Sequence, residues 1–165
     1  MPCACKNPPV NVPDNVEWGP VFWKLLHGLA ERCGSAPLPG LRGDEVRAWQ
    51  GLLTNLAKTL PCEDCRTHLT NYILINPVNF PDNYGDLNVY IKTWLYNVHE
   101  NVNIRLSKAP FVYTQLQTKY ANVPLKKTYE ILQVLIKRSV HGSAVSLLSW
   151  NNWSKHIKIL FGLYN

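Results

Sequence analysis

The segment LPCEDCRTH occupies residues 60–68 and combines several signals of one kind of site. Pro61 suits the first turn of a helix, because its missing N–H would have no partner there. Cys62 and Cys65 follow at once, so both thiols would lie where that helix starts. Free backbone N–H groups and the positive end of the helix dipole stabilise a negative charge there and lower the pKa of a thiol. The segment therefore predicts a reactive pair of cysteines.

The 165 residues are enough for one domain with its own core. The formal net charge is +6, but like charges are clustered only in short groups such as Lys126-Lys127. A nucleic-acid-binding surface is normally denser in basic residues, so we expect no nucleic-acid partner. No apolar run is long enough to span a membrane, and the N-terminus lacks the apolar core of a signal peptide. We therefore expect a cytoplasmic protein without a membrane partner.

Apolar residues recur at helical spacing along most of the chain, and no stretch alternates with period two for long. We expect a first helix from about Glu17, capped by Asp14 or Asn15, to Cys33-Gly34. The second should run over about 44–58, the third from Cys62 to about 75, and the fourth over about 86–107. Two more are expected over about 124–140 and 144–163.

These helices predict an all-α protein with a four-helix bundle core. The expected divisions are a flexible arm over 1–14, a domain over 15–113 and a C-terminal helical extension of unknown role over 120–165. Cys33 falls on a core face, where it would act as a small buried apolar residue.

Three interpretations of Cys62 and Cys65 are open. The first is a pair of structural thiols. The second is a helical zinc-binding interaction module, in which Cys3 and Cys5 complete the four ligands that zinc needs, although the gap to Cys62 is far longer than in known zinc modules. The favoured interpretation is a redox pair. A thioredoxin-like protein would place such a pair after a β-strand, and none precedes Leu60. An all-helical dithiol protein therefore needs another electron acceptor, and a flavin is the natural one.

Two expected helices also carry aromatic and polar residues at helical spacing. Trp23 and His27 stand one turn apart on the first helix. The fourth helix carries a second group, with a lysine just past its end that could reach a phosphate: Trp94, His99, Asn103 and Lys108. Singly, such residues are usually structural, but together they would form a slot for flat rings and a charged tail.

In three patterns the chain resembles the Erv/ALR family of FAD-linked sulfhydryl oxidases. They are Trp18-Gly19-Pro20-x-x-Trp23-x-x-x-His27, then Pro61-Cys62-x-x-Cys65, then Trp94-x-x-x-x-His99-x-x-Val102-Asn103-x-x-Leu106-x-Lys108. The resemblance covers about residues 15–113. The Cys3-Ala4-Cys5 motif near the terminus, without a signal peptide, is most similar to the versions of large DNA viruses of the iridovirus type.

The resemblance implies that FAD is the cofactor and that Cys62 exchanges with dithiol protein substrates while Cys65 contacts the isoalloxazine. Electrons would pass from the substrate through this pair to FAD and then to O2, giving H2O2 and disulfide bonds in proteins. It also implies a homodimer in the host cytoplasm or the virion, with the mitochondrial intermembrane space as the alternative. The residues expected to line the FAD site are Gly19, Trp23, His27, Cys65, Trp94, His99, Asn103 and Lys108.

The chain departs from the family pattern at several positions. Glu100 stands where many members have Asn, and Ser107 stands where they have Gly. Tyr96 and Tyr113 occupy the region of a disulfide that often clamps the flavin, so that edge would be looser or packed by tyrosine rings. Cys3 and Cys5 are either a shuttle pair between Cys62–Cys65 and the substrate, or incidental thiols.

Overall fold

The computed structural model describes residues 11–164, which form seven α-helices and no strand. The all-α prediction is therefore confirmed. Cys3 and Cys5, with most of the expected arm, lie outside the described residues. The helices are α1 (Asn15–Arg32), α2 (Arg42–Thr54), α3 (Glu63–Ile75), α4 (Leu87–Arg105), α5 (Leu116–Tyr120), α6 (Leu125–His141) and α7 (Leu147–Leu163). Short 3-10 turns (Pro39–Leu41, Leu56–Thr59, Tyr84–Asp86 and Tyr113–Gln115) precede α2, α3, α4 and α5.

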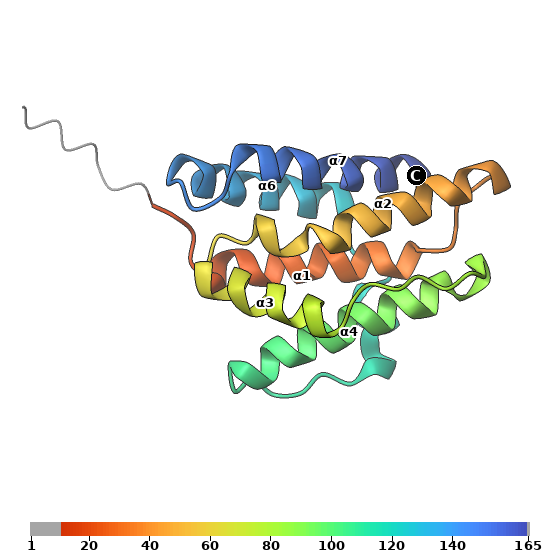
Figure 1. Ribbon diagram of the computed structural model, residues 1–165, viewed down its shortest axis with the longest axis horizontal. Coiled ribbons are helices and arrows are strands. Elements are labelled where there is room, and N and C mark those ends of the chain that lie inside the picture. Colours follow the sequence, from red (N-terminus) through yellow and green to blue (C-terminus); the bar gives the residue numbers. More distant parts are fainter. Residues whose placement is uncertain (1–10, 165) are drawn as a thin grey trace, which may run out of the picture.

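Helix α1 crosses the middle of the molecule, with α2, α6 and α7 on one side and α3 and α4 on the other (Figure 1). Its start is set by Asp14, whose side chain accepts from the backbone N–H groups of Val16 and Glu17 while the Glu17 side chain binds the Asp14 N–H. This reciprocal cap satisfies donors that a helix start leaves free. At the other end Gly34 has φ +81°, a conformation that glycine adopts without steric cost.

Helices α6 and α7 form a hairpin that packs into the core, α6 along α1 and α7 along α2 (Figure 1). Trp153 of α7 is fully buried and stacks on Phe22 of α1 at 5.7 Å between ring centroids. Its indole N–H also donates to the carbonyl of Leu52 at 3.0 Å. The expected C-terminal extension therefore shares one hydrophobic core with the preceding helices.

A buried carboxylate ties four distant segments together. Glu45 of α2 has no exposed surface, and it accepts hydrogen bonds from the Gly34 N–H at 2.7 Å, the Tyr164 hydroxyl at 2.5 Å and the Tyr84 hydroxyl. Trp49 donates in turn to the Tyr164 oxygen at 2.8 Å. A buried charge without such donors would cost several kcal/mol, so this network fixes how the end of the chain joins the bundle.

Some expectations about helix ends were wrong. Pro61 was expected in the first turn of the third helix, but Cys62 is the N-cap of α3 and Pro61 lies before it. The second helix ends at Thr54 rather than near Lys58, because a 3-10 turn takes over at Leu56. The fourth helix ends at Arg105 rather than near residue 107, and the Leu106 side chain that follows it is 43% exposed. Cys33 is buried, as predicted. No helix within residues 11–164 combines the length and the hydrophobicity that crossing a membrane requires.

Candidate functional site

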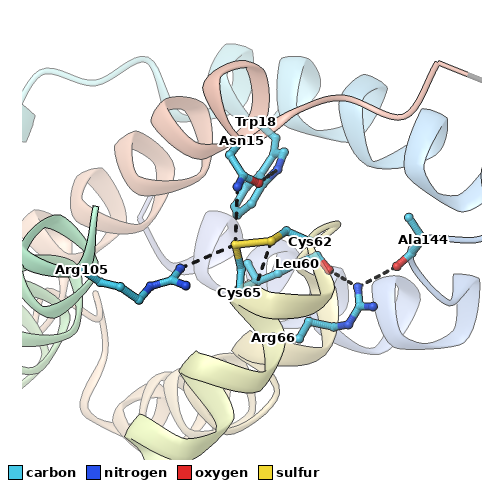
Figure 2. Close-up of a disulfide and its surroundings, with 8 residues drawn as sticks. All are labelled: Asn15, Trp18, Leu60, Cys62, Cys65, Arg66, Arg105 and Ala144. Atoms are coloured by element: carbon cyan, nitrogen blue, oxygen red, sulfur yellow. Dashed lines mark hydrogen bonds between the residues drawn. A yellow bond between two sulfur atoms is a disulfide. The ribbon is translucent and has the colours of Figure 1, made fainter. Parts of the chain in front are cut away.

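The two cysteines of the opening segment form a disulfide at the start of α3 (Figure 2). Cys62 is the N-cap residue of α3, and its sulfur accepts the backbone N–H of Cys65 at 3.2 Å. The Cα atoms are 5.1 Å apart, a separation that a disulfide spans readily. Both side chains are half-buried, so the bond lies at the surface, where another thiol can reach it.

Two polar side chains from other helices contact the sulfur of Cys65 (Figure 2). Nδ2 of Asn15, on α1, lies 3.6 Å from this sulfur, and Nη2 of Arg105, on α4, lies 3.9 Å from it. An amide dipole and a cation both stabilise a thiolate. When the disulfide opens, a negative charge on Cys65 is therefore favoured.

A cavity of about 730 Å³ opens beside the disulfide. Its size suits a cofactor or a drug-sized ligand. Residues of α1 and α4, Cys65 of α3, the segment after α4, and α5 form its walls. They are Asn15, Val16, Trp18, Gly19, Pro20, Trp23, Lys24, Cys65, His99, Asn103, Leu106, Lys108, Lys119 and Tyr120.

Stacked rings form one wall of this cavity. The indole of Trp23 and the imidazole of His99 are 4.2 Å apart and within 7° of parallel. Behind them His27 is almost fully buried, with Nε2 at 2.9 Å from Nδ1 of His99 and its ring stacked on Tyr120 at 4.6 Å. Nδ1 of His27 is buried without a hydrogen-bond partner. The wall is thus flat, aromatic and rich in ring nitrogens.

Both histidines are held neutral. Burial, with smaller contributions from the charges of His99 and Lys119, lowers the pKa of His27 to about 3. Burial is also the main cause that lowers the pKa of His99 to about 4, and Lys119 and Lys108 add to it. A neutral imidazole carries one donor and one acceptor nitrogen, so each ring can donate one hydrogen bond and accept another.

The charged groups of the cavity are cations. Lys24, Lys108 and Lys119 line it, whereas none of the residues that form its walls is Asp or Glu. Lysine is a compact point charge that binds phosphate groups. The cavity therefore offers a flat aromatic wall, a cationic side and a redox sulfur, the features that an anionic, planar redox cofactor needs.

Most of the residues expected from the sequence meet at this cavity. Gly19 leaves it open, because an added Cβ would meet no atom within 4 Å. His27 lies behind the wall, in contact with His99. The predicted residues that line the cavity are Gly19, Trp23, Cys65, His99, Asn103 and Lys108.

Trp94 lies elsewhere. It is buried, it packs edge-on against Tyr72, and its N–H points at the carbonyl of Asn76 at 3.4 Å. Five residues along a helix turn the side chain by about 140° from its starting direction, so Trp94 and His99 face different sides of α4. Trp94 is not among the residues that line the cavity.

Sequence reasoning missed eight lining residues, which are Asn15, Val16, Trp18, Pro20, Lys24, Leu106, Lys119 and Tyr120. Lys24 could have been found, because it lies four residues after Pro20 and so on the same helix face. Lys119 and Tyr120 belong to α5, a five-residue helix that is too short to show a periodic pattern.

The two tyrosines in the region where the resemblance would place a clamping disulfide pack together. Tyr96 and Tyr113 make an edge-to-face contact at 5.3 Å between ring centroids. The Tyr96 hydroxyl also donates to the carbonyl of Phe111 at 2.7 Å. These contacts hold the segment after α4, which carries Lys108, against the helix.

The zinc interpretation is not favoured. Within residues 11–164 no group of three or more His, Cys, Asp or Glu side chains is placed to hold a metal ion. Cys62 and Cys65 are joined to each other, whereas zinc is bound by thiolates.

A model of the Erv1/Alr family matches residues 20–121. The chain belongs to the Erv1/Alr family. The match covers most of α1 and all of α2 to α5, and it ends before the α6–α7 hairpin.

Viral proteins are among the relatives in this family. An FAD-linked sulfhydryl oxidase of African swine fever virus is 32% identical over 111 residues, which cover 67% of this chain and 86% of that protein. A putative FAD-linked sulfhydryl oxidase of Frog virus 3 is 38% identical over 94 residues, or 55% of this chain and 57% of that protein. No solved structure matches the chain in such a comparison.

Proposed function

We propose that this protein is an FAD-dependent thiol oxidase that forms disulfide bonds in proteins. One observation carries the proposal: Cys65, half of a surface disulfide, also lines a cavity with an aromatic wall and a cationic side. A thiol oxidase needs this arrangement, because electrons must pass from the surface to a cofactor. The names of the viral relatives, FAD-linked sulfhydryl oxidases, agree with it.

The residues of the cavity fit FAD. Trp23 and His99 would hold a flat ring of the cofactor, and Lys24, Lys108 and Lys119 would bind its diphosphate. When bound, FAD supplies a two-electron acceptor that O2 can oxidise again, with H2O2 as the product. The role of the protein is to place Cys65 beside it and to shape the site.

The protein's own residues perform the thiol chemistry. A substrate thiolate attacks the sulfur of Cys62, the Cys62–Cys65 bond breaks, and Cys65 leaves as a thiolate beside Asn15 and Arg105. The second substrate thiolate then attacks the substrate sulfur of the mixed disulfide and releases Cys62. The substrate gains a disulfide, and two electrons remain on the reduced pair, with Cys65 facing the cavity.

Cys3 and Cys5 are proposed as a shuttle pair for this exchange. The chain that leads to them is held near the redox end, because Arg138 of α6 donates to the carbonyl of Asn11 at 3.0 Å and pairs with Glu17 at 2.9 Å. Asn15, four residues further on, contacts the sulfur of Cys65. Five residues lie between Cys5 and Asn11, and the six steps of chain that join them span at most about 20 Å. We propose that this length lets Cys5 exchange with Cys62.

A homodimer and a cytoplasmic location complete the proposal. The homodimer rests on the family resemblance alone, and light scattering after size exclusion tests it: a mass of one chain would refute it. The cytoplasmic location rests on the resemblance to the versions of large DNA viruses, and imaging of a tagged protein in cells tests it against the intermembrane space.

One experiment tests the activity itself. The purified protein should carry the visible absorbance of bound flavin, and with a dithiol and O2 it should produce one H2O2 for each disulfide formed. A colourless protein that neither binds added FAD nor consumes O2 with dithiols would refute the proposed function.

A further inference from the structure

One arginine joins the redox turn to the C-terminal hairpin. Nη1 of Arg66, on α3, donates to the carbonyl of Leu60 at 2.6 Å and to the carbonyl of Ala144 at 2.8 Å (Figure 2). Leu60 is two residues before Cys62, and Ala144 lies in the loop between α6 and α7. A single half-buried guanidinium thus links two backbone segments that are 84 residues apart in the sequence.

The hairpin side of this link is firmly held. The Ala144 N–H donates to the carbonyl of Ser139 at 2.8 Å, and both Ser139 and the neighbouring Val145 are buried. Through Trp153 the hairpin is also fixed to the central helices. The loop is therefore a rigid point from which a side chain can hold another segment.

The redox side is a short segment, in which the Leu60 N–H also donates to the carbonyl of Ala57 at 3.3 Å. Leu60 is buried, and Cys62 is already the N-cap of α3. The carbonyl of Cys62 accepts the backbone N–H of Arg66, so Arg66 meets this segment on both sides of Pro61. Because the contacts are to carbonyl oxygens, they fix the backbone that carries Cys62.

We propose that Arg66 is a positioning residue through which the α6–α7 hairpin holds Cys62 close to Cys65 and thereby sets how readily this pair is reduced. The proposal rests on the proposed function only in treating the pair as the redox centre. The residue to which Arg66 links the redox turn is Ala144, which lies outside residues 20–121, the part of the chain that matches the family.

The physical reason is the freedom of the reduced pair. Reduction by glutathione converts one disulfide and two GSH into two thiols and one GSSG, with two electrons moving to the protein. Holding two reacting groups close together favours the bond between them. If Arg66 no longer holds the segment before Cys62, the reduced form gains conformational freedom, and the disulfide becomes easier to reduce.

The test measures this equilibrium directly. The full-length protein with its flavin is equilibrated without oxygen in GSH/GSSG buffers, acid-quenched and alkylated, and the state of Cys62 and Cys65 is determined by mass spectrometry. Arg66→Gln should lower the ratio [GSH]²/[GSSG] at half-reduction about threefold to tenfold, and the shift should persist in high salt. Arg47→Gln, which removes an exposed arginine of α2, should leave the ratio unchanged.

Two further variants separate positioning from charge and from stability. Arg66→Lys keeps a charge and a donor, so its [GSH]²/[GSSG] ratio at half-reduction should lie between those of Arg66→Gln and the original chain. Ala144→Pro removes the bond to Ser139 and displaces the Ala144 carbonyl, so it should shift the ratio in the same direction. In the double variant with Arg66→Gln, the two effects should be less than additive, because both break one link.

An unchanged ratio in Arg66→Gln, even with a lower melting temperature, would overturn the proposal, because the role would then be structural only. Fully additive effects, or a shift that high salt abolishes, would overturn it too. A shifted ratio in a protein without oxidase activity would instead refute the proposed function and leave this inference standing.

Discussion

Nε2 of His27 lies 2.9 Å from Nδ1 of His99, and this contact joins α1 to α4 behind the aromatic wall of the cavity. Only one of the two nitrogens can carry the proton in such a contact, so the pair is stable only while at least one ring is neutral. Burial keeps both rings neutral near pH 7, with pKa values of about 3 for His27 and about 4 for His99.

This contact predicts a loss of stability in mild acid. In the unfolded chain the histidines have a pKa near 6.5, so between pH 6.5 and about 4 the unfolded chain binds more protons than the folded chain. The free energy of unfolding should therefore decrease as the pH falls through this window and should gain no slope from these two groups above about pH 7. Denaturant unfolding at a series of pH values measures how the free energy of unfolding depends on pH.

The matched variants make this prediction specific. His27→Gln removes one titrating ring, so its unfolding free energy should depend less steeply on pH between 6.5 and 4. His141→Gln, at the exposed end of α6, should keep the steep slope of the original chain. Equal slopes in all three proteins would contradict the neutral buried pair.

Lys119 should strengthen cofactor binding. Lys119→Glu reverses a charge at the cavity, so it should raise the dissociation constant of FAD about tenfold to a hundredfold, which corresponds to about 1.4–2.8 kcal/mol. Flavin fluorescence on release measures the constant, and the difference should shrink as salt screens the charges. Lys137→Glu makes the same charge change on the exposed side of α6. If this variant weakened FAD binding as much as Lys119→Glu, the loss of affinity would come from the net charge of the protein and not from the cavity.

The α6–α7 hairpin should be essential for stability. Trp153→Ala deletes a fully buried ring that stacks on Phe22, which should cost about 3–5 kcal/mol of unfolding free energy and lower the melting temperature by about 10 °C or more. Leu148→Ala, on the same helix but 70% exposed, should change the unfolding free energy by no more than about 0.5 kcal/mol. Similar small effects from both would mean that the hairpin does not belong to the core.

If Cys3 and Cys5 form a shuttle pair, their loss should affect the oxidation of protein substrates but not of small dithiols. Cys3→Ser together with Cys5→Ser should leave the oxidation of a small dithiol unchanged, because such a substrate reaches Cys62 directly. Oxidation of a folded protein dithiol should slow about tenfold or more. Rates of O2 consumption with each substrate measure the split, and unchanged rates with the protein substrate would rule the shuttle out.

Features that depend on short-range chemistry could be predicted from the sequence. Asp14 caps α1 because its side chain is the right length to accept from the backbone two and three residues on, and Gly34 ends the helix region because it tolerates a positive φ. Cys62 likewise marks the start of α3 as its N-cap, whereas Pro61 lies before the helix and not in its first turn as expected. These choices involve neighbours in the chain, so a sequence pattern carries them.

Features that depend on the packing of distant segments could not be predicted in this way. Glu45 follows Asp44 near the start of α2, and nothing local shows that Tyr84 and Tyr164 will surround it with donors. Lys119 reaches the cavity only because α5 packs across α1. The position of Trp94, by contrast, follows from helix geometry: it stands five residues before His99, so it could not share the face of His99.

In the proposed function, Cys65 passes electrons to FAD across the cavity. The most direct measurement is anaerobic addition of a dithiol to the flavin-loaded protein, with the visible flavin absorbance followed over time. The original chain should bleach, and so should Cys33→Ala, which removes a buried cysteine outside the cavity. Cys65→Ser should bind flavin and keep its colour. If Cys65→Ser bleached as fast as the original chain, Cys65 would not be the electron donor to the cofactor.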